Sequence, residues 1–304
     1  MLDVCLLGTS GMMPLPGRYL TSALLRFNGS SLLIDAGEGT QVAIRSCGWS
    51  MNPIDTILIT HFHGDHISGI GGLLLSMANS DRKDPVRIIG PKGLKDVIRC
   101  LLVIAPSLPF ALEYTELEEP IETFAIKGMN ITAFRVYHNV TCYGYSIEVP
   151  RGGEFFPEKA KALNIPLKYW NPLQKGNTVE DPDNGQVYTP DMVLGEKRKG
   201  IKVTYCTDSR PVDRIRECAE GSDLFICEGM YGDTEKAADA KEKKHMTMQE
   251  GAYLASDAHV RELWFTHYSP SMTHPEHYIG EIRKIFPSAK ASKDGRWKTI
   301  NFED

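Results

Sequence analysis

Residues His61 to His66, in the order His-Phe-His-Gly-Asp-His, place four metal-ligand side chains within six positions. On an extended chain residues two apart face the same way, so His61 and His63 can bind one cation together. Gly64 allows a turn that directs Asp65 and His66 toward a second cation. Imidazole nitrogens suit zinc, and a neighbouring carboxylate favours a catalytic site that stays partly open to water. The spacing therefore predicts a site for two metal ions.

The alternative is a histidine-rich turn that only caps a buried strand. The preceding run, residues 56–60, is apolar and β-branched, as a buried strand would be. However, several titratable groups crowded at one strand end would repel one another unless a cation held them. We therefore favour the metal site.

Three residues farther along the chain offer the remaining ligands. His138, Asp208 and His267 each follow an apolar or aromatic run and precede turn-forming residues. We expect all three to emerge at one edge of a stack of sheets, where Asp208 could bridge two metals with its two oxygens. Taken alone, each is more often a hydrogen-bonded histidine at a strand end or an aspartate that caps a helix. Their combination with the first motif favours metal binding.

His245 has a different setting. It follows the charged run 241–244 and precedes an expected helix at 248–257, which places it in a loop and not at a strand end. This position indicates a mobile acid more than a ligand.

The elements that position these residues mix strands and helices along the whole chain, without repeats or low-complexity segments. Such mixing predicts an α/β (α+β) fold in which two sheets lie between outer helices. Strands are expected near residues 4–7, 22–27, 32–35, 56–60, 86–89, 129–137, 143–149, 201–206, 224–227 and 262–266. Helices are expected near residues 41–46, 73–78, 94–104, 211–219, 248–257 and 275–286.

Residues 150–200 differ from the rest in composition. Proline, glycine and charge are dense there, and residues 177–185 predict a turn, so we expect an arm inserted in a single domain, 1–304, and protruding from it. Basic residues gather within or beside this segment, together with Trp170. A solvated face would give the same lysine pattern.

Composition limits the class of protein. The chain has 304 residues, enough for one large domain or two fused units, and no run approaches the ~20 apolar residues that span a bilayer. The first residues lack the basic start of a secretory signal, and the seven cysteines form no Cys-x-x-Cys pair, so we expect reduced thiols and a cytoplasmic location. The net charge of −5 is unusual for a protein that binds nucleic acid, which needs local positive charge.

Several segments together resemble the metallo-β-lactamase superfamily and, within it, the ribonuclease Z family, whose members mature the 3′ end of transfer RNA. The likeness covers nearly the whole chain. It rests on residues 7–11 with Pro14, 33–41, 59–69, 90–93, 208–211 and 266–267. The His61–His66 motif alone identifies only the superfamily. His63 argues against the di-iron flavoproteins of this fold, and Asp208 stands where true β-lactamases have cysteine.

The resemblance implies a metallo-β-lactamase fold, a four-layer αββα sandwich. It implies one zinc bound by His61, His63 and His138. It assigns the other to Asp65, His66 and His267, with Asp208 bridging the two. Manganese or iron could replace zinc.

The resemblance also implies the chemistry. Two such metals can hold a hydroxide between them and clamp the phosphate that it attacks. Asp65 is the expected proton acceptor as well as a ligand. His245, paired with Glu228, is the expected general acid, which protonates the departing 3′ oxygen.

The departures from the family lie in substrate recognition. The loop 14–19 lacks the family's lysine and asparagine, and the arm lacks its Gly-Pro pair, with Gln174 in place of a lysine. An arm with altered contacts is therefore expected. The residues expected to bind RNA are Arg18, Lys168, Trp170, Lys175, Lys197, Arg198 and Lys199.

These observations predict a zinc-dependent endoribonuclease that cleaves precursor tRNA at its 3′ side and leaves a 3′-hydroxyl. The resemblance implies that it acts as a homodimer. No membrane is expected among its partners. One alternative is a related hydrolase of small phosphodiesters or sulfate esters. A second alternative, an RNA-binding module without catalysis, is disfavoured because a binder has no need of His245 as an acid.

Overall fold

The computed structural model describes residues 1–105 and 107–303, and the chain divides into two compact units. Unit 1 comprises residues 1–148 and 202–301. Unit 2 comprises residues 149–201 together with Phe302 and Glu303.

Unit 1 contains two seven-stranded sheets. The first, in the order β16-β1-β2-β3-β4-β5-β6, consists of β1 (Leu2–Gly8), β2 (Ser22–Phe27), β3 (Ser30–Ile34), β4 (Ile54–Leu58), β5 (Val86–Pro91), β6 (Leu112–Leu117) and β16 (Trp297–Ile300). The second, in the order β15-β14-β13-β12-β9-β8-β7, consists of β7 (Ile121–Ile126), β8 (Met129–Val136), β9 (Cys142–Arg151), β12 (Arg198–Cys206), β13 (Leu224–Glu228), β14 (Leu263–Thr266) and β15 (Ala289–Ala291). The runs β3 to β6 and β12 to β15 are parallel, so their carboxyl ends share an edge within each sheet.

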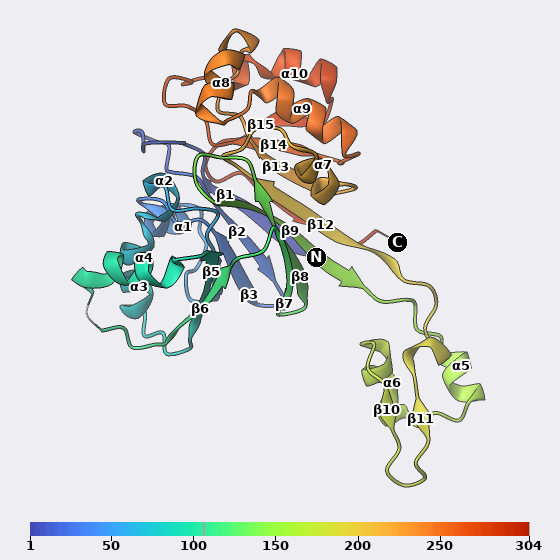
Figure 1. The fold of residues 1–304 in the computed structure, drawn as a ribbon. Coiled ribbons are helices and arrows are strands. Elements are labelled where there is room, and N and C mark those ends of the chain that lie inside the picture. The colour runs from blue at the N-terminus through green and yellow to red at the C-terminus, as the bar shows by residue number, and fades with distance from the viewer. Residues whose placement is uncertain (106, 304) are drawn as a thin grey trace. The chain divides into compact units, whose positions relative to one another are not determined.

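Helices cover the outer faces of both sheets (Figure 1). On the first sheet lie α1 (Thr40–Ser46), α2 (Gly64–Ile67), α3 (Ile70–Ala78), α4 (Leu94–Leu101) and the short 3₁₀ helix η1 (Leu102–Ile104). On the second lie α7 (Asp213–Ala219), η3 (Thr234–Lys236), α8 (Ala237–Lys243), α9 (Met248–Asp257), η4 (Pro275–His277) and α10 (Ile279–Ile285). The expected order of layers, helix, sheet, sheet and helix, is confirmed.

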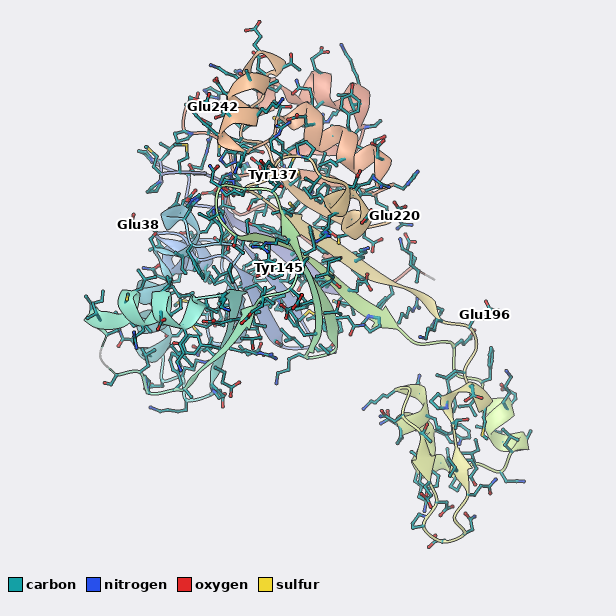
Figure 2. All side chains as sticks on the ribbon, viewed as in Figure 1. Glu38, Tyr137, Tyr145, Glu196, Glu220 and Glu242 are labelled. Carbon is teal, nitrogen blue, oxygen red and sulfur yellow. The ribbon has the colours of Figure 1, made fainter. Side chains whose placement is uncertain are left out.

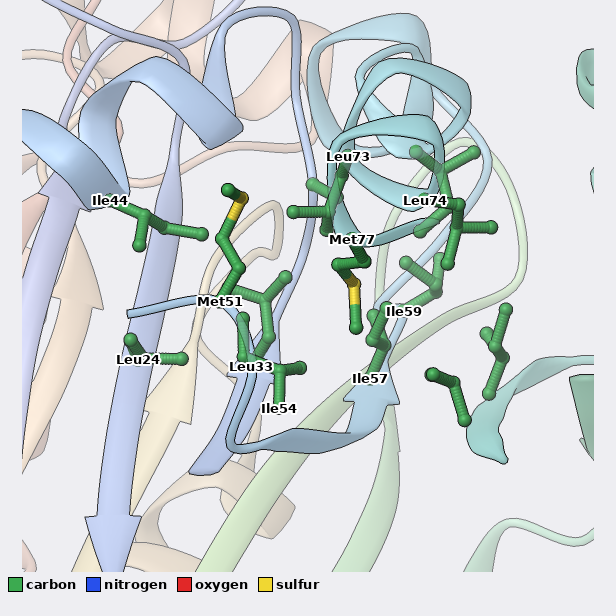
Figure 3. Close-up of a cluster of buried hydrophobic side chains, with 14 of the residues drawn as sticks. Leu24, Leu33, Ile44, Met51, Ile54, Ile57, Ile59, Leu73, Leu74 and Met77 are labelled. Carbon is green, nitrogen blue, oxygen red and sulfur yellow. The ribbon is translucent and has the colours of Figure 1, made fainter. Parts of the chain in front are cut away.

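Apolar side chains on both faces of the sheets hold these layers together. Figure 3 shows Leu33 and Ile57 of the first sheet facing Leu73 and Met77 of α3, and all four are fully buried. Burying one such side chain contributes roughly 1.5–3 kcal/mol. Between the sheets, the hydroxyl of Tyr145 on β9 (Figure 2) donates to the carbonyl of Ile59 at 2.7 Å. The strand ends that carry the site are therefore held by helices on one face of the sheet and by the second sheet on the other.

Unit 2 has a small core of its own. Its elements are α5 (Pro157–Ala162), α6 (Leu167–Gln174), β10 (Val179–Glu180), β11 (Val187–Tyr188) and η2 (Pro190–Met192). The buried residues are Ala160, Ile165, Leu173, Tyr188 and Val193. Among the described residues of the whole chain, no helix has the length and apolar character needed to cross a membrane.

The expected strands and helices are present, with differences at sheet edges and helix ends. The helix expected at 94–104 is α4 followed by η1, and that expected at 275–286 divides into η4 and α10. The strands β6, β7, β15 and β16 of the large sheets, and β10 and β11 of unit 2, were not predicted. Their residues are largely half-buried or exposed and include charges, so they lack the apolar signal of a central strand.

Candidate two-metal site

The site residues follow the ends of strands in unit 1. Asp35 comes directly after β3, Asp208 two residues after β12, and His267 directly after β14. All three have left-handed backbone conformations, with φ of 60°, 51° and 56°. Such conformations are uncommon for residues other than glycine and persist where the surroundings enforce them, often at functional sites.

A first group of donor atoms contains His61, His63, His138 and Asp208, with one atom from each within 4.8 Å of the others. Asp208 directs Oδ2 toward this group, 3.8 Å from Nε2 of His61 and 3.7 Å from Nε2 of His138. His61 and His63 of the sequence motif and the distant His138 therefore gather around one carboxylate oxygen.

A second group contains Asp65, His66 and His267. The other oxygen of Asp208, Oδ1, lies 3.1 Å from Nε2 of His66 and 3.2 Å from Nε2 of His267. Asp65 Oδ2 lies 3.4 Å from Nε2 of His267. Asp208 thus presents one oxygen to each group, which is the arrangement of a bridging carboxylate.

The donor atoms fit divalent cations. His66 Nδ1 lies 2.8 Å from Oδ2 of Asp35, and its Nε2 lies only 3.2 Å from Nε2 of His267. Burial would lower the pKa of His66, but the charges of Asp208 and Asp35 outweigh it and raise the pKa, so a cation at Nε2 would displace a proton. Burial lowers the pKa of His61 and of His138, which leaves neutral imidazoles able to coordinate. Within the described part of the chain, His61 Nε2 and Asp208 Oδ1 are buried without a hydrogen-bond partner. Buried lone pairs this close together are stabilised by a shared cation.

Asp35 supports the site and was not predicted as a functional residue. Its carboxylate accepts hydrogen bonds from the backbone N–H of Thr60 and from Nδ1 of His66, both at 2.8 Å. A buried carboxylate behind a coordinating histidine fixes the tautomer and orientation of the ring. The sequence feature that could have identified Asp35 is its position at the end of an expected strand, within the segment 33–41.

The loop that precedes β2 also contributes to the site. The backbone N–H of Met12 donates to Asp65 Oδ2 at 2.6 Å. At Gly11, a Cβ atom would lie 2.8 Å from the ring of His267, so a side chain there would displace that histidine. The glycine allows the loop to approach the site closely.

His245 pairs with Glu228 beside the second group. His245 Nδ1 donates to Oε2 of the buried Glu228 at 3.0 Å, and Oε1 of Glu228 accepts from the backbone N–H of Ser209 at 2.6 Å. Burial would lower the pKa of His245, but the charge and hydrogen bond of Glu228 outweigh it and raise the pKa to about 9. His245 also belongs to a third donor group, with Asp208 and His267.

A cavity of about 240 Å³ opens onto these residues. Its lining includes residues that the sequence analysis did not name: Met12, Asn139, Met230, Tyr231 and Lys243. Lys243 is exposed and supplies a cation beside the donor groups, suited to a phosphate. The sequence feature that could have identified Lys243 is the charged run 241–244 next to His245.

The residues expected to bind RNA are dispersed. The Arg18 guanidinium, in unit 1, donates to the carbonyls of Met272 at 2.9 Å and Thr273 at 2.8 Å, which braces a loop. The Trp170 indole donates to the Ile165 carbonyl at 2.9 Å and packs in the small core of unit 2.

Lys168 lies 3.9–4.0 Å from the carboxylates of Asp181 and Asp183. Lys175, Lys197, Arg198 and Lys199, all in unit 2, are exposed, and the Arg198 guanidinium donates to the Gly152 carbonyl at 3.1 Å.

Curated relatives match the chain along its full length. It is 61% identical over 303 residues to a ribonuclease Z of Lachnoclostridium phytofermentans, covering 100% of this chain and 99% of the relative. It is 47% identical to a ribonuclease Z of Clostridium acetobutylicum, covering 100% of both. The chain belongs to the ribonuclease Z family. Members of this family are metal-dependent hydrolases, endoribonucleases of the metallo-β-lactamase superfamily. The family model described as Anti-Pycsar protein Apyc1 also matches residues 2–156.

Solved structures share the fold of this ribonuclease Z family member. The short form of human tRNase Z (ELAC1) matches with a TM-score of 0.70 at 23% identity, covering 99% of this chain and 100% of that one. The metallo-β-lactamase fold protein YhfI from Bacillus subtilis matches with a TM-score of 0.70 at 19% identity, covering 98% of both. The fold is therefore that of the metallo-β-lactamase superfamily.

Proposed function

We propose that this chain is a zinc-dependent endoribonuclease that cleaves precursor tRNA on its 3′ side and leaves a 3′-hydroxyl. The proposal rests on one observation. Asp208 lies between two groups of potential metal ligands, and the His245–Glu228 pair lies next to them. A phosphodiester with an alkoxide leaving group needs both electrophilic activation and a proton donor. The site offers groups for each.

The proposed ligands are those of the two donor groups. His61, His63 and His138 would hold one ion, and Asp65, His66 and His267 the other, with Asp208 shared between them. Zinc suits the imidazole-rich set, although manganese or iron would also fit. Such ions, when bound, supply Lewis acidity to the phosphate and lower the pKa of bound water.

The remaining steps belong to side chains of this protein. Asp65, whose Oδ2 faces His267, is the proposed acceptor of the proton from the attacking water. His245 donates a proton to the departing 3′ oxygen, and Glu228 holds Nδ1 of the ring so that Nε2 faces the substrate. Lys243 at the cavity would contact the phosphate.

We further propose that the segment 150–200 is an arm that binds tRNA, with Lys168, Trp170, Lys175, Lys197, Arg198 and Lys199, and that Arg18 contributes from the loop 14–19. Trp170 and Lys168 already contact other residues of unit 2, which reduces their capacity to contact RNA. A homodimer and a cytoplasmic location complete the proposal, both by analogy with the family.

Cleavage mapping tests the function. The purified, metal-loaded protein is incubated with an unprocessed tRNA, and both new ends are analysed chemically. The proposal expects one cut on the 3′ side, a 3′-hydroxyl on the tRNA and a 5′-phosphate on the trailer. A trailer that begins with a hydroxyl would contradict the proposed role of His245.

Hydrolysis of small phosphodiesters is the second possibility. It is favoured by the charge of residues 149–201, where eight lysines and arginines stand against seven aspartates and glutamates. An arm that is nearly neutral overall gives little electrostatic attraction to tRNA. Steady turnover of a chromogenic diester, with no measurable affinity for tRNA, would favour this function.

A further inference from the structure

The loop that carries His245 is held through three consecutive carbonyl groups. The carbonyl of Lys243 accepts from the side-chain amide of Asn139 at 3.3 Å, and that of Lys244 accepts from Nδ1 of His138 at 3.2 Å. The carbonyl of His245 accepts from the Arg210 guanidinium at 2.6 Å. All three hydrogen-bond donors come from the two segments that also carry the proposed metal ligands His138 and Asp208.

Arg210 is itself fixed in place. Its guanidinium contacts both carboxylate oxygens of Glu250, one of them at 3.0 Å, and its side chain is only 17% exposed. Glu250 also accepts from the backbone N–H of Thr247 at 2.9 Å and completes the capping box of α9. A bidentate arginine–carboxylate pair is strong and geometrically specific. The direction of the guanidinium is therefore set by the first turn of α9.

The backbone of Arg210 links the same segments. Its N–H donates to the carbonyl of Tyr137 at 3.0 Å (Figure 2), and the Ser209 hydroxyl accepts from the N–H of Tyr137 at 3.1 Å. Lys244 has a left-handed conformation, with φ of 57°. A lysine in this conformation is strained, so the loop needs external contacts to keep its shape.

We propose that Arg210, oriented by Glu250, is a positioning residue that holds His245 at the distance needed for proton transfer. This inference rests on the proposed role of His245 as the acid. Glu228 fixes the rotation of the ring, whereas Arg210 fixes the backbone from which the ring extends. Misplacing a reacting group by about 1 Å can cost on the order of 10²-fold in rate.

The alternative is that Arg210 only stabilises α9. The two roles differ in their dependence on the leaving group. An acid is essential for an alkoxide leaving group and nearly dispensable for nitrophenolate, so loss of positioning should affect only the first. A loss of stability would lower the rates with both substrates in equal proportion.

The test uses Arg210→Lys and Glu250→Gln in the metal-loaded enzyme, each alone and combined with His245→Ala. Rates are measured on precursor tRNA and on two small diesters, one with an alkoxide and one with a nitrophenolate leaving group. Arg216→Gln on α7 is the matched control, because its side chain is 40% exposed and contacts neither His245 nor Glu250 in the described structure. Metal content and thermal unfolding are measured for every variant.

The inference expects Arg210→Lys to slow the alkoxide substrates by on the order of 10²-fold. It expects a smaller loss of the same kind for Glu250→Gln, and nitrophenolate release and metal content close to those of the unaltered enzyme. In the His245→Ala background the Arg210 change should add nothing. An additional loss in that background, or equal losses on both diesters, would overturn it. If tRNA is not a substrate but the diesters are cut, the proposed function fails while the diester pair still tests the positioning role.

Discussion

The candidate two-metal site of unit 1 and the basic segment of unit 2, the proposed arm, differ in how their side chains are held. In the site, the side chains of His66, Asp208 and His267 are almost completely buried and lie within contact distance of one another. In unit 2, Lys175, Lys197, Arg198 and Lys199 are exposed. Buried donors fixed by several partners suit chemistry, which needs geometry accurate to a fraction of an ångström. Exposed cations suit long-range attraction to phosphates, which tolerates movement.

Because of this difference, we expect that mutations can separate catalysis from the recognition of tRNA. A change in the site should affect every substrate, because all depend on the same donor groups. A change in unit 2 should affect only a substrate large enough to reach it.

Asp208→Ala should remove both metal ions and reduce the rate on every substrate by roughly 10³-fold or more, since Lewis acidity is worth several kcal/mol. The reason is that each oxygen of Asp208 faces one donor group. Elemental analysis decides the outcome, with Asp223→Ala as the control, a buried carboxylate outside the site. Two metals retained per chain would break the bridging assignment.

His245→Ala should keep both metals but slow the cleavage of RNA by about 10²–10⁴-fold, the usual contribution of one general acid. A diester with a nitrophenolate leaving group should be cut almost as before. Loss of metal from this variant would make His245 a ligand of the third donor group instead of an acid.

Asp35→Asn should weaken metal affinity by about 10–100-fold, the usual cost of losing a carboxylate behind a coordinating histidine. Asparagine tolerates the left-handed conformation at this position, so the backbone should be retained. Competition with a chelator measures the affinity. Unchanged affinity would show that His66 is oriented without Asp35.

Replacing Lys197, Arg198 and Lys199 by glutamine should raise the KM for precursor tRNA. It should also make the dependence of affinity on salt less steep by roughly 1 to 3 in logarithmic slope, at about 0.9 for each lost phosphate contact. The rate on a small diester should not change. A matched triple of exposed lysines in unit 1, Lys83, Lys236 and Lys284, serves as the control. Equal effects of the two triples would remove the distinction between the regions.

Glu262→Gln should lower the stability of unit 1 slightly without affecting either function. Burial would raise the pKa of Glu262, but hydrogen bonds from Lys290, Lys298 and Trp264 outweigh it and lower the pKa to about 2. The stabilisation is therefore complete above about pH 4.3, the unfolded value, and is lost as the pH falls toward 2. We expect a loss of about 1 kcal/mol at neutral pH and no difference near pH 2, measured by denaturant unfolding.

The sequence predicted the strands that precede the proposed ligands because those strands are rich in apolar and β-branched residues and are followed within three residues by a histidine or an aspartate. It could not predict β6, β7 and β16, whose exposed residues carry no such signal. It gave the residues that converge in the donor groups, since metal ligands are restricted to a few residue types. It did not reveal that Asp35, Lys243 and Arg210 lie at or beside the site, because their placement depends on contacts between segments far apart in the chain.

The arm was harder to interpret for a related reason. Trp170 was expected to stack on RNA, yet its indole hydrogen-bonds to the Ile165 carbonyl and packs against Phe155. A core aromatic and a binding aromatic look identical in a sequence. Likewise, basic residues alone do not reveal that Lys168 lies close to Asp181 and Asp183.

Replacing residues 152–196 with a short Gly-Ser linker tests the separation of chemistry from recognition most directly. Metal content, diester hydrolysis and tRNA affinity are measured on the same folded preparation. We predict two metals per chain, diester hydrolysis close to that of the intact enzyme, and loss of most of the affinity for precursor tRNA. Unchanged tRNA affinity in this metal-loaded variant would contradict the account and place recognition in unit 1.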